Sequence, residues 1–158
     1  MNTEQKPKPI KQLAKNRKAF HEYHIAERYE AGLVLRGTEV KAIRAGKMTI
    51  SESWVSIDAN QEAYLMQANV SPYDHGNIYN HTPERPRKLL LKKKQLRELV
   101  EVSQQKGMTI IPLQVYLKGN NIKVEIAVAR GKQAHDKRET QKAREADREI
   151  ARALRGRH

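Results

Sequence analysis

The feature that most constrains the fold is a pair of alternating apolar runs on either side of Gly119-Asn120-Asn121. The apolar residues at every second position are Ile111, Leu113, Val115 and Leu117 in the first run, and Ile122, Val124, Ile126 and Val128 in the second. A period of two predicts strands with one buried face, and Gly and Asn favour the tight turn between them. We therefore expect an antiparallel hairpin here.

The rest of the body shows the same preference for strands, with two helices. Strands are expected from residue 20 to 35 and on both sides of the turn-forming residues 58–61, and helices near residues 38–46 and within 88–107. About six antiparallel strands of this kind usually close into a barrel, which removes exposed edges. We predict a mainly β (α+β) fold, a six-stranded OB-like barrel with two or three helices and a basic C-terminal tail. A sandwich is the alternative.

The chain divides by composition into three parts. Residues 1–19 are polar, basic and interrupted by proline, which predicts a loose N-terminal arm, and residues 20–130 form the barrel. Residues 131–158 contain 9 cations and 5 carboxylates, and only Ile150 and Leu154 are larger aliphatics. Such a segment cannot bury enough apolar surface to offset its ordering entropy, so we expect a flexible tail that orders on a partner.

The tail nevertheless has helical order in its pattern. On a helix, Ala143, Ala146, Ile150 and Leu154 would form a narrow apolar seam, beside a basic row of Arg144, Arg148, Arg152 and Arg155. Opposite charges three residues apart would add only about 0.2–0.5 kcal/mol each. An isolated helix of this kind is marginal, so we expect it to fold mainly on a polyanionic surface.

The net charge points to the class of partner. The sequence has 31 Lys and Arg against 18 Asp and Glu, a formal charge of +13, which is typical of a protein that binds nucleic acid. An anionic membrane would also attract this charge, but no amphipathic segment has the bulky apolar face that membrane binding requires. The absence of cysteine excludes disulfides and thiolate metal sites. Without a signal-like or membrane-spanning run, we expect a soluble, cytoplasmic protein.

The sequence offers no positive argument for an enzyme. His75 and His81 lie six residues apart beside Asp74, but the further ligands that a zinc site needs are not visible. There is no phosphate-cradling glycine loop and no carboxylate run for a metal. We expect no catalytic residue, metal, cofactor or small-molecule substrate. A hydrolase that acts on nucleic acid through these histidines is kept as an alternative.

Several cations could contact RNA phosphates or simply face water. They are the run of residues 91–97, "LKKKQLR", together with Lys41 and Arg44 on the early helix and Lys123 on the last strand. Exposed aromatic residues are few, so stacking on single-stranded bases is disfavoured. A folded RNA read by its shape and backbone fits better. A protein that holds ribosomal RNA constitutively is the second alternative.

Five segments in order resemble the small protein B family, the SsrA-binding partners of bacterial transfer-messenger RNA (tmRNA). They are "NRKAFHEY" (16–23), "YEAGLVLRGTEVKAIRAGK" (29–47), "NVSPYDHGN" (69–77), "NHTPERPRKLLL" (80–91) and "ARGKQAHDKRET" (129–140). The resemblance implies an OB-type barrel that grips the tRNA-like domain of tmRNA and enters the vacant decoding site of a stalled ribosome. The tail would probe the empty mRNA channel and fold there, which licenses tagging of the nascent peptide.

The resemblance and the charge and tail patterns together give two sets of site residues; the resemblance itself implies Asn16, Glu30, Leu90, Lys123, Gly131, His135, Asp136, Lys137 and Arg138. Those expected toward the tRNA-like domain are Asn16, Arg17, Glu30, Lys41, Arg44, Leu90 and Lys123. Those expected at the ribosomal RNA of the decoding centre and mRNA channel are Gly131, Lys132, His135, Asp136, Lys137, Arg138, Arg144, Arg148, Ile150 and Arg152. The chain departs from the family pattern at Trp54, commonly Tyr or Phe, and at Asn69-Val70, commonly His-Ile.

Overall fold

The computed structural model describes residues 10–72 and 82–155. Nine strands and four helices occur in these two ranges. In chain order they are β1 (Ile10–Lys15), α1 (Ala19–Glu22), β2 (Tyr23–Leu33), α2 (Gly37–Arg44), β3 (Met48–Thr49), β4 (Trp54–Ile57), β5 (Ala63–Met66), β6 (Asn69–Val70), β7 (Arg87–Leu90), α3 (Lys93–Ser103), β8 (Met108–Lys118), β9 (Asn121–Gly131) and α4 (Ala134–Arg155).

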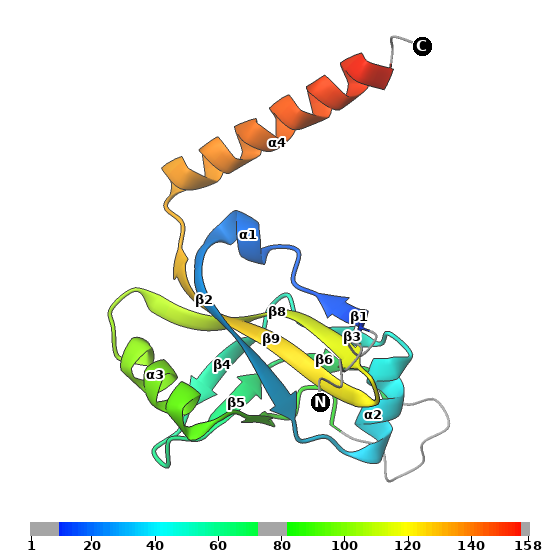
Figure 1. Cartoon of the computed structure of the whole chain (residues 1–158), viewed down its shortest axis with the longest axis vertical. Coiled ribbons are helices and arrows are strands. Elements are labelled where there is room, and N and C mark those ends of the chain that lie inside the picture. The colour runs from blue at the N-terminus through cyan, green and yellow to red at the C-terminus, as the bar shows by residue number, and fades with distance from the viewer. Residues whose placement is uncertain (1–9, 73–81, 156–158) are drawn as a thin grey trace, which may run out of the picture.

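The strands form a strongly curved antiparallel sheet (Figure 1). The order β1-β8-β9-β2-β7-β5-β4 makes seven strands, and β3 pairs with β6 in a separate small ladder. The main core lies inside the curve, where side chains such as Ile43, Leu65, Leu99 and Ile126 are fully buried. This mainly β, OB-like architecture confirms the predicted fold class. The strand count is higher than predicted, partly because residues 88–90, expected to begin a helix, belong to β7.

The closing hairpin is confirmed, but its alternation is interrupted. The β8–β9 pairing shifts by one residue between Pro112 and Gln114. A bulge of this kind turns the following side chains to the opposite face. Ile111 and Leu113 therefore pack in a second, smaller cluster, whereas Val115 belongs to the main core. The strict period of two predicted all three residues on one face, and this was wrong because a bulge leaves no clear signal in the pattern.

The N-terminal arm was predicted to stay loose as far as residue 19, and the structure corrects this. Ile10–Lys15 form β1, which pairs with β8 from Ile10 opposite Lys118 to Lys15 opposite Gln114. Residues 1–9 lie outside the described part of the chain. The edge of β8 offers backbone N–H and C=O groups to a neighbouring strand. A polar segment can pair with them even if its own strand propensity is low, because strand formation depends on the neighbouring strand.

A buried ion network holds α2 against the sheet. Neither Glu39 of α2 nor Arg87 of β7 has any exposed side-chain surface, and Arg87 Nε lies 2.5 Å from Glu39 Oε2. Arg85 Nη2 donates to the other carboxylate oxygen at 2.5 Å, as does the backbone N–H of Arg36 at 2.8 Å. Arg87 also donates to the carbonyls of Ala68 and Pro83. The network therefore joins α2, the segment after β5 and the segment before β7.

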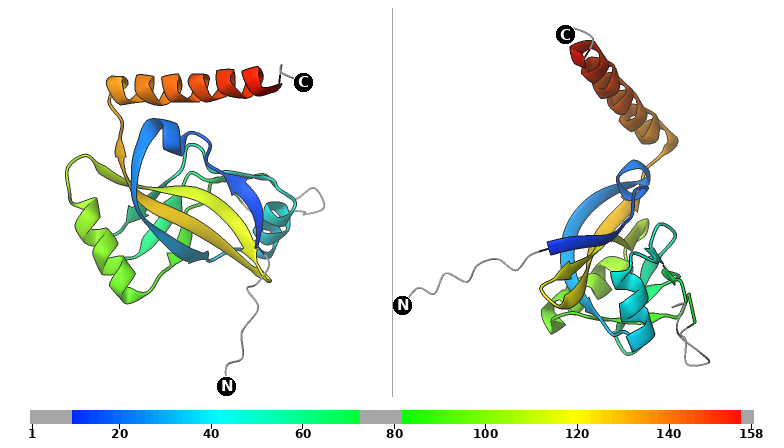
Figure 2. Two further views of the ribbon diagram at one scale, coloured as in Figure 1. Left: turned by 45° about the horizontal axis from the view of Figure 1, so that its top comes forward. Right: turned by 90° about the vertical axis from the view of Figure 1, so that its right-hand side faces the viewer.

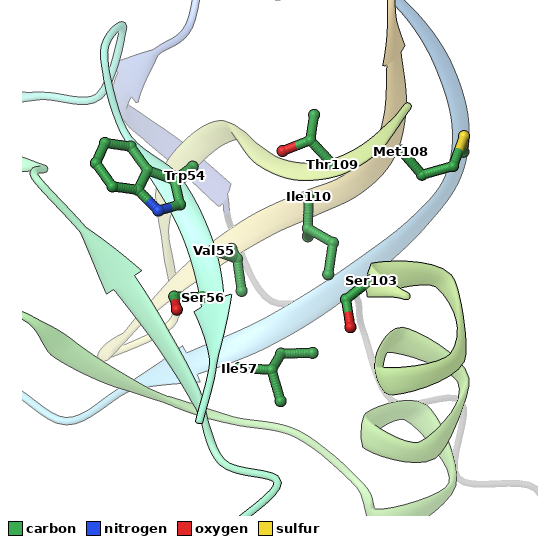
Figure 3. A pocket seen from close by; sticks show the side chains of 8 residues that line it. All are labelled: Trp54, Val55, Ser56, Ile57, Ser103, Met108, Thr109 and Ile110. Atoms are coloured by element: carbon green, nitrogen blue, oxygen red, sulfur yellow. The ribbon is translucent and has the colours of Figure 1, made fainter. Parts of the chain in front are cut away.

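The curved sheet meets itself at a seam between β4 and β8. β4 approaches β8 but is not its neighbour in the hydrogen-bonded strand order. The seam is therefore lined by side chains and is not closed by backbone hydrogen bonds. Figure 3 shows the hollow there, about 290 Å³ in volume, with Val55 and Ile57 on β4, Ile110 on β8 and Ser103 at the end of α3. The hollow has no charged residue in its lining, so it does not suit a polyanion.

The C-terminal segment is a long helix that leaves the body beside α1 (Figures 1 and 2). The helix α4 contains 22 residues, and every residue from 141 to 150 is exposed. Its helical form agrees with the predicted pattern. That it orders only on a partner stays a prediction.

Candidate nucleic-acid interface

Three predicted RNA contacts gather where β9, β2 and β7 lie side by side. Gly32 of β2 pairs with Lys123 of β9 on one side and with Leu90 of β7 on the other. Gly32 has no side chain, so the surface between Lys123 and Leu90 is recessed. The Leu90 side chain remains 53% exposed. The hollow has a volume of about 450 Å³ and is also lined by Glu30 and Lys92. The result is an open, shallow site that presents a cation beside an apolar side chain.

Glu30 is held in a fixed, ionised state within this site. The Tyr116 hydroxyl donates a short hydrogen bond to its carboxylate, and Lys118 Nζ lies 3.3 Å from the same group. The hydrogen bond from Tyr116 is the main cause that lowers the pKa of Glu30; Lys118 and Lys123 add to it and outweigh partial burial. An oriented carboxylate on a basic surface cannot neutralise phosphate, but it can accept a hydrogen bond from a base amine or orient a nearby cation.

The start of α3 adds further positive charge to the rim. Lys92, Lys93 and Lys94 are all exposed, and the first turn of α3 has no acidic residue. The N-terminus of a helix carries partial positive charge, so lysines there are unfavourable by a few tenths of a kcal/mol each, roughly, and anions are favoured. Gln95 accepts a hydrogen bond from the Lys92 backbone N–H. The site therefore combines a helix N-terminus with cations that locally destabilise it, which is typical of phosphate binding.

The structure brings together only part of the predicted set. Asn16 is 3% exposed, and its side-chain amide donates to the Pro112 carbonyl at 2.9 Å. It lines a different hollow, so the structure does not bring it into the hollow that Lys123 lines, and its contact with the tRNA-like domain stays a prediction. Arg17 beside it is exposed. Lys41 and Arg44 are exposed on α2, and neither lines the hollow formed by Glu30, Leu90 and Lys123.

The predicted ribosome-facing residues lie on the last strand, the connection after it and α4. Gly131 is the final residue of β9 and pairs with Tyr23, so it is part of the sheet. Lys132 follows directly and bonds to α1. The exposed residues of α4 in this set are Arg138, Arg144, Arg148, Ile150 and Arg152. The side chains of His135, Asp136 and Lys137 lie outside the described ones.

Sequence reasoning did not place Gly32 in the site, and it offered Lys92 and Gln95 only as members of the run 91–97, which could contact RNA or face water. A glycine inside a strand is a signal for close approach of another group, and Gly32 is the second-last residue of β2. A Cβ at this position would lie 3.3 Å from the Leu90 Cβ. Lys92 belonged to a recognised cationic run, but only the meeting of β7 and α3 places it in the lining of the same hollow as Lys123.

The described residues contain no group of three or more metal-ligating side chains and no helix that could span a membrane. The pair proposed for a hydrolytic site, His75 and His81, lies outside the described ranges.

Comparisons with known proteins agree over most of the chain. The family described as SmpB protein matches residues 13–156. The SsrA-binding protein of Carboxydothermus hydrogenoformans is 49% identical over 146 residues, which cover 92% of this chain and 97% of that protein. The SsrA-binding protein of Shouchella clausii is 52% identical over 147 residues, which cover 93% and 94%.

A solved structure gives the same result at the level of the fold. A chain from the work described as "tmRNA-SmpB: a journey to the center of the bacterial ribosome" is 45% identical, with a TM-score of 0.64, and the match covers 76% of this chain and 84% of that chain. A family match over nearly the whole length and relatives at about half identity leave one assignment. This chain belongs to the SmpB protein family.

Proposed function

We propose that this protein is a non-enzymatic RNA-binding adaptor for ribosome rescue by trans-translation. Its barrel binds the tRNA-like domain of tmRNA and stands in for an anticodon arm in the ribosomal A site, and its tail enters the empty mRNA channel. The observation that carries the proposal is the separation of two basic surfaces, a shaped hollow on the barrel and an exposed helix, in a chain whose relatives are SsrA-binding proteins. This role places the protein in the cytoplasm.

The barrel hollow suits a folded RNA better than a single strand. Lys123 and the lysines at the start of α3 provide charge for backbone phosphates, and Leu90 offers an apolar surface to a ribose or base face. Glu30 adds an acceptor that selects for a base amine or an ordered cation. No aromatic side chain lines this hollow, so recognition rests on shape, backbone and a few oriented polar groups.

The tail suits a narrow anionic channel. Arg144, Arg148 and Arg152 are exposed on α4, and Ile150 on the same helix is 60% exposed. In solution this apolar side chain has nothing to cover it among the described residues, so a complex that buries it stabilises the helix. The walls of an empty mRNA channel supply both the anionic surface and the enclosure.

Truncation tests the two-part mechanism. We expect a chain ending at Gln133 to retain affinity for the tRNA-like domain within about threefold, because the whole hollow precedes this point, and to lose peptide tagging on ribosomes stalled at a truncated message. The measurements are electrophoretic mobility shift with the isolated RNA domain and tagging in a reconstituted translation system. Equal loss of both activities would contradict the proposal.

The matched control is a full-length Lys123→Ala variant, which leaves the tail intact. Its RNA affinity should fall, and raising its concentration should restore tagging, whereas no concentration of the truncated chain should do so.

A further inference from the structure

The short helix α1 connects the barrel to the point where the tail leaves it (Figures 1 and 2). Its first residue, Ala19, is fully buried in the second cluster, against Ile111, Leu113 and Ala127. A four-residue helix has little stability of its own, so its position depends on these contacts. The cluster thereby fixes α1 to the outer face of the β8–β9 hairpin.

The segment before α1 is tied to the same hairpin. The backbone N–H of Asn16 donates to the Leu113 carbonyl at 2.8 Å, and its side-chain amide donates to the Pro112 carbonyl at 2.9 Å. Both acceptors lie on β8, next to the bulge. Asn16 is therefore an anchor for α1, which gives a structural reason for its burial.

The other end of α1 holds the start of the tail. Lys132 donates its backbone N–H to the Glu22 carbonyl at 2.8 Å and its Nζ to the Phe20 carbonyl at 2.9 Å. Carbonyls at the end of a helix have no partner within it, and a cation is favourable beside them. Lys132 thus caps the C-terminal end of α1, and the same two hydrogen bonds hold Lys132 against α1.

These contacts place the pivot of the tail. β9 ends at Gly131, Lys132 is bonded at two points, and α4 begins at Ala134. Only Gln133 lies between Lys132 and the first residue of α4. A helix attached through so short a connection can adopt few orientations relative to the barrel. The geometry of residues 131–133 therefore sets the direction of α4.

We propose that Lys132 is a positioning residue, which fixes the exit of the tail by bonding to α1, and that it does not act through contact with ribosomal RNA. Its consequence for tagging rests on the function proposed above. Because the barrel is held by one RNA and the tail must find a separate channel, fixing the exit direction reduces the orientations that the tail must search.

The test measures backbone order in the free protein, where no RNA is present. In the wild type we expect ¹⁵N order parameters near 0.85 through Lys132, with any decrease beginning at Gln133, and in Lys132→Ala we expect values below about 0.6 at residues 132 and 133. Lys132→Arg retains a side-chain donor and should stay close to wild type. Lys142→Ala removes an exposed cation from the same segment and is the matched control.

Function is measured on the same variants. Lys132→Ala should bind the tRNA-like domain within about twofold of wild type and tag stalled peptides about tenfold more slowly, the factor that corresponds to one charged hydrogen bond. Lys132→Arg should restore tagging.

Unchanged order parameters in Lys132→Ala would overturn the positioning role, whatever happens to tagging. If residues 132 and 133 loosen in Lys132→Ala but the wild-type protein does not bind tmRNA, the positioning role of Lys132 is supported and the proposed function is rejected.

Discussion

Removing the charge of Glu39 should destabilise the protein more than removal of any exposed carboxylate. In Glu39→Gln the side-chain volume is kept, but the guanidinium of Arg87, which has no exposed surface, loses its counter-ion at 2.5 Å. Its remaining partners are the neutral carbonyls of Ala68 and Pro83. An uncompensated buried charge of this kind costs about 3–5 kcal/mol.

The assay is urea unfolding followed by circular dichroism. With a slope of about 2 kcal/mol per molar urea, a loss of about 3 kcal/mol lowers the midpoint by roughly 1.5 M. The matched control is Glu62→Gln, whose partner Lys88 lies 3.1 Å away with both side chains about 40% exposed. Because exposed pairs contribute about 0–1 kcal/mol, its midpoint should barely move.

The double variant Glu39→Leu with Arg87→Met separates the loss of a charge from the loss of a contact. It removes both charges and should be more stable than Glu39→Leu alone, since hydrophobic residues of similar volume often replace a buried ion pair without cost. A cost for Glu39→Gln below about 1 kcal/mol, or additive costs in the double variant, would refute the reasoning that the buried charge decides the effect.

The same pair makes stability depend on pH. Burial alone would raise the pKa of Glu39, but hydrogen bonds from Arg85, the Arg36 backbone and Arg87 outweigh it and hold the pKa below its ordinary value of 4.5. A carboxylate with a lowered pKa contributes stability above 4.5, and this contribution is lost as the pH falls through the lowered value. The difference between wild type and Glu39→Gln should therefore shrink below pH 4.5, as parallel urea titrations would show.

Three further changes test the barrel site. Lys123→Ala should weaken binding of the tRNA-like domain and reduce the slope of log affinity against log salt by about one, whereas Lys106→Ala, in the exposed turn beyond the far end of α3, should change neither. Gly32→Val should fill the floor of the hollow and reduce RNA affinity, with circular dichroism still showing a folded barrel, and wild-type affinity would show that the hollow is not used. Tyr116→Phe removes the hydroxyl that donates to Glu30, so ¹³C titration should show the pKa of Glu30 rising toward its ordinary value, and an unchanged titration would show that the bond does not form in solution.

Local patterns in the sequence were enough to predict the class of fold, and the order of the motifs was enough to indicate the family. The hairpin around Gly119, the turn at residues 58–61 and the helix before Gly107 all depend on neighbours in the chain, and the structure has them, although a bulge interrupts the alternation in β8 and α3 already ends at Ser103. Gly46 directly follows the C-cap of α2, and Gly107 lies in the turn between α3 and β8; their φ of +79° and +81° is the left-handed conformation for which glycine is suited. Net charge and the order of the motifs likewise need no coordinates.

What the sequence could not determine depends on residues that are distant along the chain. The pairing of Ile10–Lys15 with β8, and the row formed by Lys123, Gly32 and Leu90, exist only because separate strands meet. The side chain of Glu39 reads locally as a helix-start residue, yet it is buried because Arg87 arrives 48 residues later.

Asn16 and Lys132 show the same division most clearly. A motif places both in a functional set, and their polar side chains suit RNA equally well. Only the tertiary structure turns one toward β8 and the other toward α1. The physical reason is that composition and spacing determine which groups can make hydrogen bonds, whereas the partners, and therefore the roles, are decided by which segments the folded chain brings within about 3 Å of each other.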